Sequence, residues 1–414
     1  MDRSHTDTVL WTSDLSPERQ GRTDLVGGTP TPCICQRSFS RSPPRARAQV
    51  LQAAKRLTGT GSSNTITLEK ETGRFVSYGA ARLPDLSRAE TKLTPKIATL
   101  PDIASPPLLT TTVPREYVHR SSLAEVFLTG YRQLDESVYA LTGQWPRAHT
   151  FFTSADGTRH DPMQAVETIR QAGLCLAHAE FGVPLGYQFL MQDLKVTTHA
   201  EHLVIGTTPS DLALTATCVG MKWRGKRLSE FTLHITVERD GFLCAFGGGT
   251  FTCIAPSTYR RLRGAAHSAQ CPAKTHTGDQ GDPARFGRAL PFDVVLSPTD
   301  RPDRWRVDPD PRHPTLFDHG ADHIPGMVLL EAARQAAHSI SWPHLLTPSV
   351  LRAEFQRYAE FDSPCWIEAS SAPANGNDGA TCVSVTGRQS GHTVFTAQVV
   401  GSLAVRESAA RSLV

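Results

Sequence analysis

The sequence lacks a long apolar run: none of its 414 residues fall in an uninterrupted apolar stretch of roughly 18 residues, the length that predicts a membrane-spanning helix. The first residues also lack the short apolar core of a secretory signal. The formal net charge is only +3, which does not predict the strongly basic surface of a nucleic-acid-binding protein. We therefore expect no membrane span, no nucleic-acid partner and a cytoplasmic location.

Paired metal ligands are also missing. The chain has nine cysteines, and only Cys33 and Cys35 lie close together. Their spacing does not fit a zinc site, and no matching Cys or His pair follows. We expect reduced thiols, no metal and no cofactor. The length allows two or three domains, and the apolar and charged fractions of 39% and 20% are typical of a globular protein.

A repeat is the most informative feature that is present. The segment DHIPGMVLLEAARQAA at 322–337 recurs in looser form as HDPMQAVETIRQAG at 160–173. When Glu331 is aligned on Glu167, three further pairs coincide: Met327 on Met163, Arg334 on Arg170 and Gln335 on Gln171. A repeat at this separation predicts two similar domains in tandem.

Both copies read as amphipathic helices. Asp161 and Pro162 are start signals for the first copy, and Pro325 has the same place in the second. At about 100° per residue, small and apolar side chains share one face, and the Glu, Arg and Gln of each copy share the opposite face. An exposed i,i+3 ion pair is the plainer interpretation. Because the trio occurs twice between apolar runs, we expect it to be buried and to need a partner or ligand.

The domain boundaries follow from composition. We expect a low-complexity, disordered extension at 1–109, with a short helix near 48–57 and strands near 66–78, then domains at 110–255 and 288–407, a linker at 256–287 and a tail at 408–414. Each domain shows two short strands, one long helix and a run of strands, which predicts an α+β fold with a sheet wrapped round a helix. One expected strand spans 203–208. Gly247–Gly249 lies inside a strand pattern, so we interpret it as a bend rather than a phosphate loop.

These residues resemble the A-factor synthase (AfsA) family of γ-butyrolactone and butenolide autoregulator biosynthesis. The ordered motifs that carry the resemblance are Val118–Arg120, Glu125–Gly130, Gln144–His149, His160–Gln171, His178, Gly182–Gly186 and Asp318–Gln335. The resemblance covers roughly residues 110 to 407. The long N-terminal extension lies outside it, and Ala332-Ala333 departs from Thr168-Ile169 of the first copy.

The resemblance implies a tandem hotdog fold that packs as a pseudo-dimer within one chain, either as a monomer or as a homodimer. It also implies an acyltransferase that moves a β-ketoacyl group from an acyl carrier protein, or another acyl thioester, to a hydroxyl of dihydroxyacetone phosphate. The product is the ester precursor of a γ-butyrolactone or butenolide signal, and such signals commonly control antibiotic production.

Such a transfer needs a base, oxyanion donors and a cation for the phosphate. We expect the catalytic groups to be Glu331, Arg334, Glu167 and Arg170, with burial raising the pKa of each glutamate. The second domain is the preferred active half, since His319, Asp322 and His323 precede its helix. The expected substrate-binding residues are Gln171, Gln335, His160, His323, Gly326, Arg147 and His119. A metal site at Asp318, His319, Asp322 and His323 is a weaker alternative.

Two other function classes remain open. One is a hotdog thioesterase or 3-hydroxyacyl-thioester dehydratase, and the other is a non-catalytic acyl-binding module. Two basic clusters are candidates for docking an acidic carrier protein, with a solvated surface as the plainer interpretation. Their members are Arg224, Lys226, Arg227, Arg260, Arg261 and Arg263.

Overall fold

A computed structural model describes residues 10–11, 109–269, 282–374 and 379–404. The helix expected at 48–57, the strands at 66–78 and the Cys33/Cys35 pair lie outside these residues. No helix in the described ranges is long and apolar enough to cross a membrane.

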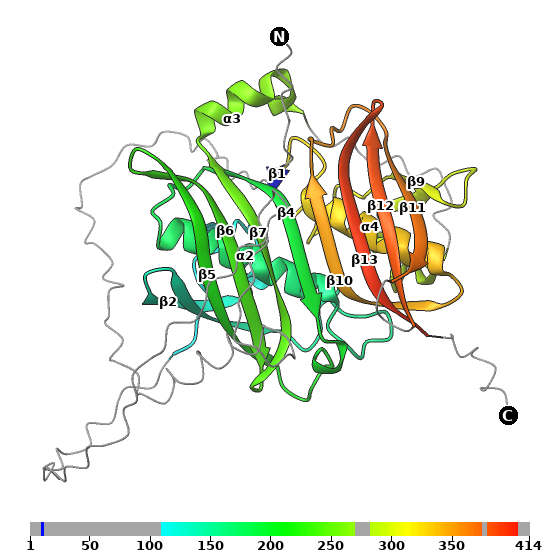
Figure 1. Ribbon diagram of the computed structural model, residues 1–414, viewed down its shortest axis with the longest axis horizontal. Coiled ribbons are helices and arrows are strands. Elements are labelled where there is room, and N and C mark those ends of the chain that lie inside the picture. Colours follow the sequence, from blue (N-terminus) through cyan, green and yellow to red (C-terminus); the bar gives the residue numbers. More distant parts are fainter. Residues whose placement is uncertain (1–9, 12–108, 270–281, 375–378, 405–414) are drawn as a thin grey trace, which may run out of the picture. The chain divides into compact units, whose positions relative to one another are not determined.

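The described strands form one antiparallel sheet of 13 strands. The first half contributes, in sheet order, β2 (Leu128–Asp135), β3 (Val138–Trp145), β5 (Ser210–Arg224), β6 (Arg227–Arg239), β7 (Phe242–Ile254) and β4 (Gln188–Thr198). The second half continues with β10 (Leu345–Phe355), β13 (His392–Ala404), β12 (Ala380–Gln389), β11 (Cys365–Pro373), β9 (Arg304–Val307) and β8 (Leu296–Pro298). The short β1 (Leu10–Trp11) pairs with β4. The two halves therefore meet strand to strand (Figure 1).

One long helix belongs to each half: α2 (Pro162–Ala179) and α4 (Gly326–Ser341). Asp161 caps α2 by accepting from the Met163 N–H, and Pro162 needs no partner at the first position. Every α2 residue from Met163 to His178 is buried, because the sheet and the loops surround the helix. Each half is thus an antiparallel sheet wrapped round a central helix. This confirms the predicted α+β tandem hotdog fold.

Shorter helices complete the fold. They are α3 (Pro256–Arg263) and the 3-10 turns η1 (Arg115–Val118), η2 (Leu123–Glu125), η3 (Ala200–His202), η4 (Gly264–Ser268), η5 (Pro283–Phe286) and η6 (Pro291–Asp293). The strand expected at 203–208 is wrong. Leu203 and Ile205 instead exchange backbone hydrogen bonds with His160 and Thr158, so this segment braces the loop before α2 and does not join the sheet.

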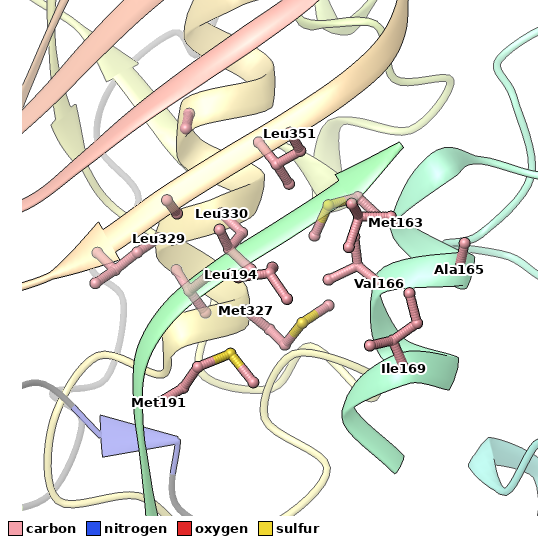
Figure 2. Packing of buried hydrophobic residues seen from close by; sticks show 14 of the residues in the cluster. Met163, Ala165, Val166, Ile169, Met191, Leu194, Met327, Leu329, Leu330 and Leu351 are labelled. Atoms are coloured by element: carbon pink, nitrogen blue, oxygen red, sulfur yellow. The ribbon is translucent and has the colours of Figure 1, made fainter. Parts of the chain in front are cut away.

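The seam is the region where β4 pairs with β10 and where α2 and α4 begin. Lys195 faces Arg352 in the ladder, and the register runs from Asp193 opposite Glu354 to Thr197 opposite Val350. Apolar side chains fill the space between these strands and the helices (Figure 2). They include Met163, Val166, Leu194, Met327 and Leu351. The core is therefore continuous from one half to the other.

The three glycines at 247–249 lie within β7, as the strand interpretation predicted. A Cβ on Gly247 would lie 2.2 Å from the Lys195 carbonyl oxygen, and one on Gly248 would lie 1.8 Å from that of Leu233. A Cβ on Gly249 would lie 2.2 Å from the Asp193 oxygen. Glycine is needed here because β4 and β6 approach this strand too closely for any side chain.

Candidate active site

Glu167, which is fully buried on α2, is the centre of the first polar cluster. Arg120 donates from Nε to Oε1 at 2.9 Å, and Arg170 donates from Nε to Oε2 at 2.9 Å and from Nη2 to Oε1 at 2.8 Å. Gln171 Nε2 adds a bond of 2.7 Å to Oε1. The carboxylate is therefore held by two guanidinium groups and one amide.

Glu331 on α4 is the centre of an equivalent cluster. Arg288 donates to Oε1 at 2.8 Å and to Oε2 at 2.6 Å. Arg334 donates to Oε2 at 2.9 Å and to Oε1 at 2.7 Å, and Gln335 Nε2 lies 2.6 Å from Oε1. The buried trio predicted from the repeat is present in both halves, and its partner in each is an arginine that the repeat did not reveal.

These additional arginines cross the seam. Arg120 of the first half donates to the Thr315 carbonyl of the second at 2.9 Å. Arg288 of the second half donates to the Phe151 carbonyl of the first and forms an ion pair of 3.4 Å with Asp161. Each cluster thus joins its own helix to the backbone of the other half, and the polar faces of both helices lie at the joint.

The glutamines attach the helices to the sheet. Gln171 accepts from the Phe127 N–H at 2.9 Å and donates to the Glu125 carbonyl at 2.7 Å. Gln335 makes the matching bonds to the Val295 N–H and the Asp293 carbonyl. Both glutamines have every polar group of their amides engaged in the protein, so their geometry is that of structural links.

The expected rise in the pKa of the glutamates is wrong. Burial alone raises the pKa of Glu167, but the charges of Arg120 and Arg170 and their hydrogen bonds outweigh it and lower the pKa to about 2. The pKa of Glu331 is lowered in the same way by Arg288 and Arg334. Both carboxylates are ionised at neutral pH and have their oxygens occupied, so neither is arranged to accept a proton from a substrate.

The residues before α4 lie against the first half. The Asp318 carboxylate accepts from the Ser121 and Ser122 N–H groups at 2.6 and 3.1 Å. The charge of His319 contributes to lowering the pKa of His119, which belongs to the first half. The preference for the second half rested partly on His319, which belongs with the Glu167 side of the seam rather than with Glu331.

Asp322 and His323 form part of a buried network under α3. Tyr259 donates to both Asp322 oxygens at 2.8 and 2.9 Å, and Arg263 donates to Oδ2 at 3.1 Å. His323 Nδ1 lies 2.6 Å from Asp322 Oδ1. Arg263 also pairs with Glu360 at 2.6 Å, so its place in an exposed basic cluster was a wrong expectation. The described residues contain no group of side chains that could hold a metal ion.

Three other expected binding residues are not among the residues that hold the Glu167 or Glu331 carboxylate. His160 is buried between Gln164 Oε1 at 3.0 Å and Ser210 Oγ at 3.1 Å, and burial lowers its pKa to about 4. Arg147 is exposed and donates to the Gly206 carbonyl. Gly326 is the first residue of α4, which has no side-chain cap. His119, by contrast, lies beside the Glu167 cluster and contacts His178.

A narrow apolar cavity of about 20 Å³ lies in the seam. Its lining comes from both halves: Pro162, Met163, Val166, Val196, Thr198, Arg334, Pro348, Ser349, Val350, Leu351 and Val399. Thr198 Oγ1 is buried without a hydrogen-bond partner among the described residues. A cavity of this size has room for about one water molecule, so a hydrocarbon chain enters it only when the aliphatic side chains of its walls move aside.

The first prediction concerns Glu167→Gln, which leaves two buried guanidinium groups without their counter-ion. We expect it to lower the free energy of unfolding by about 3–5 kcal/mol at pH 7. Because the folded pKa of about 2 lies below the ordinary 4.5, this stabilisation is complete above pH 4.5 and is lost as pH falls towards 2. Denaturant unfolding from pH 7 to 3 measures it.

The matched control is Glu116→Gln. Glu116 forms an exposed pair of 3.2 Å with Arg115, so its loss changes the free energy of unfolding by less than about 1 kcal/mol. Equal effects of the two substitutions would contradict the role assigned to the buried cluster.

Comparison with known proteins agrees with this architecture. The family described as "AfsA: A-factor biosynthesis hotdog domain" matches residues 102–255 and 273–404. A 2-oxo-3-(phosphooxy)propyl 3-oxoalkanoate synthase of Streptomyces virginiae is 48% identical over 293 residues, which cover 70% of this chain and 97% of that protein. The protein of the same name from Streptomyces coelicolor is 40% identical over 290 residues, covering 70% and 91%.

Among solved structures, a putative oleoyl thioesterase from Lactobacillus plantarum aligns with a TM-score of 0.40 and 8% identity, over 64% of this chain and 96% of that one. A likeness of this size supports no argument about activity. The family match covers both halves of the sheet and both helices. The chain belongs to the AfsA family of A-factor biosynthesis hotdog proteins.

Proposed function

We propose that this protein is an acyltransferase that condenses a β-ketoacyl thioester with the hydroxyl of dihydroxyacetone phosphate. The name of its relatives describes the ester of these two groups, and the chain covers 97% of the S. virginiae enzyme at 48% identity. That match, extending over both halves, is the observation that carries the proposal. The product is the ester precursor of a γ-butyrolactone or butenolide signal, made in the cytoplasm.

The acyl chain lies in the seam and extends into the apolar cavity, which widens as the side chains of its walls move aside. Met163 lines this cavity, and Met327 lies in the same cluster of buried side chains (Figure 2). Methionine is flexible and adapts to ligands of different shape, so a methionine-containing wall suits an alkyl chain. Because both halves line the cavity, one chain is sufficient to form the site.

The Glu167 and Glu331 clusters hold this site in place. Their carboxylates neutralise Arg170 and Arg334, and through Arg120 and Arg288 they fix the two halves against each other. The start of α4 is the better oxyanion donor, since Gly326 follows Pro325 with no side-chain cap, whereas Asp161 occupies the start of α2. The thioester carbonyl therefore belongs near Gly326.

The second prediction is the reaction itself. Purified protein, a β-ketoacyl carrier-protein thioester and dihydroxyacetone phosphate are expected to give thiol and phosphorylated ester in equal amounts. Mass spectrometry identifies the ester, and a thiol reagent follows the rate. Dihydroxyacetone without its phosphate is the control acceptor and should react at least about tenfold more slowly, since it lacks the charged group.

The other function classes give different results in this assay. Thiol release that does not depend on the acceptor would identify a thioesterase. Loss of water from a 3-hydroxyacyl thioester would identify a dehydratase, and tight acyl binding without turnover would identify a binding module. Each of these results would replace the proposed transfer.

The third prediction tests the acyl position. Met163→Phe enlarges a side chain in the cavity wall, so kcat/KM for the longest acyl chains should fall about tenfold while that for the shortest stays within twofold. Met221→Phe is the control, because Met221 lies on β5 and outside the cavity lining. Rates with thioesters of increasing length provide the measurement, and an equal fall at every length would contradict this position.

The carrier protein docks on an exposed surface made by the first half and by α3, the helix that follows it. Arg224 and Lys226 lie at the tip of the β5–β6 hairpin, and Arg260 and Arg261 are exposed on α3. The loop at 182–187 joins these two elements through a hydrogen bond of 2.9 Å from Arg227 to Tyr187 and through the proximity of Gly186 to Pro256. Exposed Leu185, Trp223 and Leu262 add apolar area. A basic surface with apolar side chains fits an acidic partner.

The fourth prediction reverses two of these charges. The double substitution R260E/R261E should raise KM for the carrier-bound thioester about tenfold and leave KM for a pantetheine thioester within twofold. Arg132→Glu, on the edge strand β2, is the matched control and should change neither value. If both thioesters respond alike, the surface does not recognise the carrier protein.

A further inference from the structure

His119 has an unusual backbone for a residue outside a hairpin. It follows η1 with φ 53° and ψ 60°, in the left-handed region, which is unfavourable for residues other than glycine. Among the described residues, the other non-glycine positions with positive φ are Asp240 and Ser390, each directly before a glycine in a hairpin turn. A strained backbone that is retained at one residue indicates that the side chain of this residue has a function.

The second half has no histidine at this place. Arg120 and Arg288 are equivalent, so His119 corresponds to Gly287, which ends η5 with φ 66° and ψ 30°. Glycine adopts this conformation without strain. The first half therefore accepts a strained backbone where the second half uses glycine. In the second half the ring of His338, which comes from α4, lies against Gly287 instead.

The hydrogen bonds determine the tautomers of the two histidines. His178 Nδ1 lies 2.7 Å from the Val183 carbonyl oxygen, which can only accept, so His178 carries its proton on Nδ1. Neutral His178 then accepts at Nε2. His119 Nε2 lies 2.7 Å from that atom, so His119 is the donor and carries its proton on Nε2. The lone pair of neutral His119 is therefore on Nδ1, for which the described residues provide no hydrogen-bond donor.

The surroundings hold this arrangement and keep both rings neutral. Phe189 packs edge-on against His119 and His178, with 5.3 Å between the ring centroids in each pair. Burial lowers the pKa of His119 well below 6.5, and His178, Arg170 on α2 and His319 of the second half lower it further. Burial also lowers the pKa of His178. At pH 7 the lone pair on His119 is free to accept a proton.

We propose that His119 is the general base of the transfer, taking the hydroxyl proton of the acceptor on Nδ1. This rests on the proposed function. As the acceptor oxygen attacks the thioester carbon, the C–O bond forms, the C–S bond breaks and the proton moves to Nδ1. The imidazolium then returns this proton to the departing sulfur, so that ester and thiol are the only products and His119 is again neutral.

His178 acts as a positioning residue. It receives the Nε2 proton of His119 in a hydrogen bond, and the Val183 carbonyl fixes its own tautomer, so the unprotonated nitrogen of His119 is Nδ1. An imidazole anchored in this way fixes the tautomer and the orientation of His119, which is the positioning part of the role that a carboxylate has in a catalytic triad.

The fifth prediction uses His119→Gly, which copies Gly287 and removes the backbone strain. We expect only a small change in thermal stability, because relief of the backbone strain offsets part of the lost contacts of the buried ring. KM values should stay within about threefold, and kcat should fall by about 100-fold or more. Added imidazole should restore part of the rate. His178→Ala should lower kcat about tenfold. It should also move the acid limb of the pH–rate profile to higher pH, because His178 no longer lowers the pKa of His119.

His338→Asn is the matched control. His338 is the neutral histidine that packs against Gly287 in the second half, and its substitution should leave kcat within twofold. If wild type makes the ester and His119→Gly keeps a kcat within threefold, the inference is wrong while the proposed function stands. A loss of turnover with His319→Gln but not with His119→Gly would overturn it as well. If wild type makes no ester, the proposed function itself fails.

Discussion

Two buried carboxylates, each held between two guanidinium groups, are the interaction on which the rest of this structure depends. Neither Glu167 nor Glu331 is exposed, and a charge in such a place is tolerated only when it is paired and hydrogen-bonded. The arginines that complete the pairs also bind backbone carbonyls of the opposite half. The same contacts that neutralise the helices therefore fix the relative position of the halves, and with it the walls of the cavity.

Duplication gave the protein two similar polar clusters, and small differences now distinguish them. Asp161 caps α2 and pairs with Arg288, whereas α4 begins after Pro325 without a side-chain cap. One half has His119 where the other has Gly287. Such differences let one side of a pseudo-dimer keep groups available for a ligand while the other side becomes purely structural. The exposed basic residues of the β5–β6 hairpin lie on the first half, and those of α3 lie on the segment that follows it.

Much of the fold could be predicted from the sequence, because the repeat, the helix periodicity and the alternating strands are local signals. Burial of the Glu, Arg and Gln trio also followed from its repetition. The partners could not be predicted: Arg120 lies 47 residues from Glu167 and Arg288 lies 43 residues from Glu331, with no periodic relation to either helix. Without them the sign of the pKa shift was wrong. The pairing of His119 with His178 was missed for the same reason, since 59 residues separate them.

The direct pairing of β4 with β10 restricts how the protein can move. A clamshell motion of the two halves would break the inter-strand hydrogen bonds between Asp193–Thr197 and Val350–Glu354 and expose the continuous core. That cost excludes wide opening as a route for a ligand. Admission to the interior must instead come from small displacements of loops and of flexible methionine side chains, so turnover in this enzyme is expected to proceed on a nearly rigid frame.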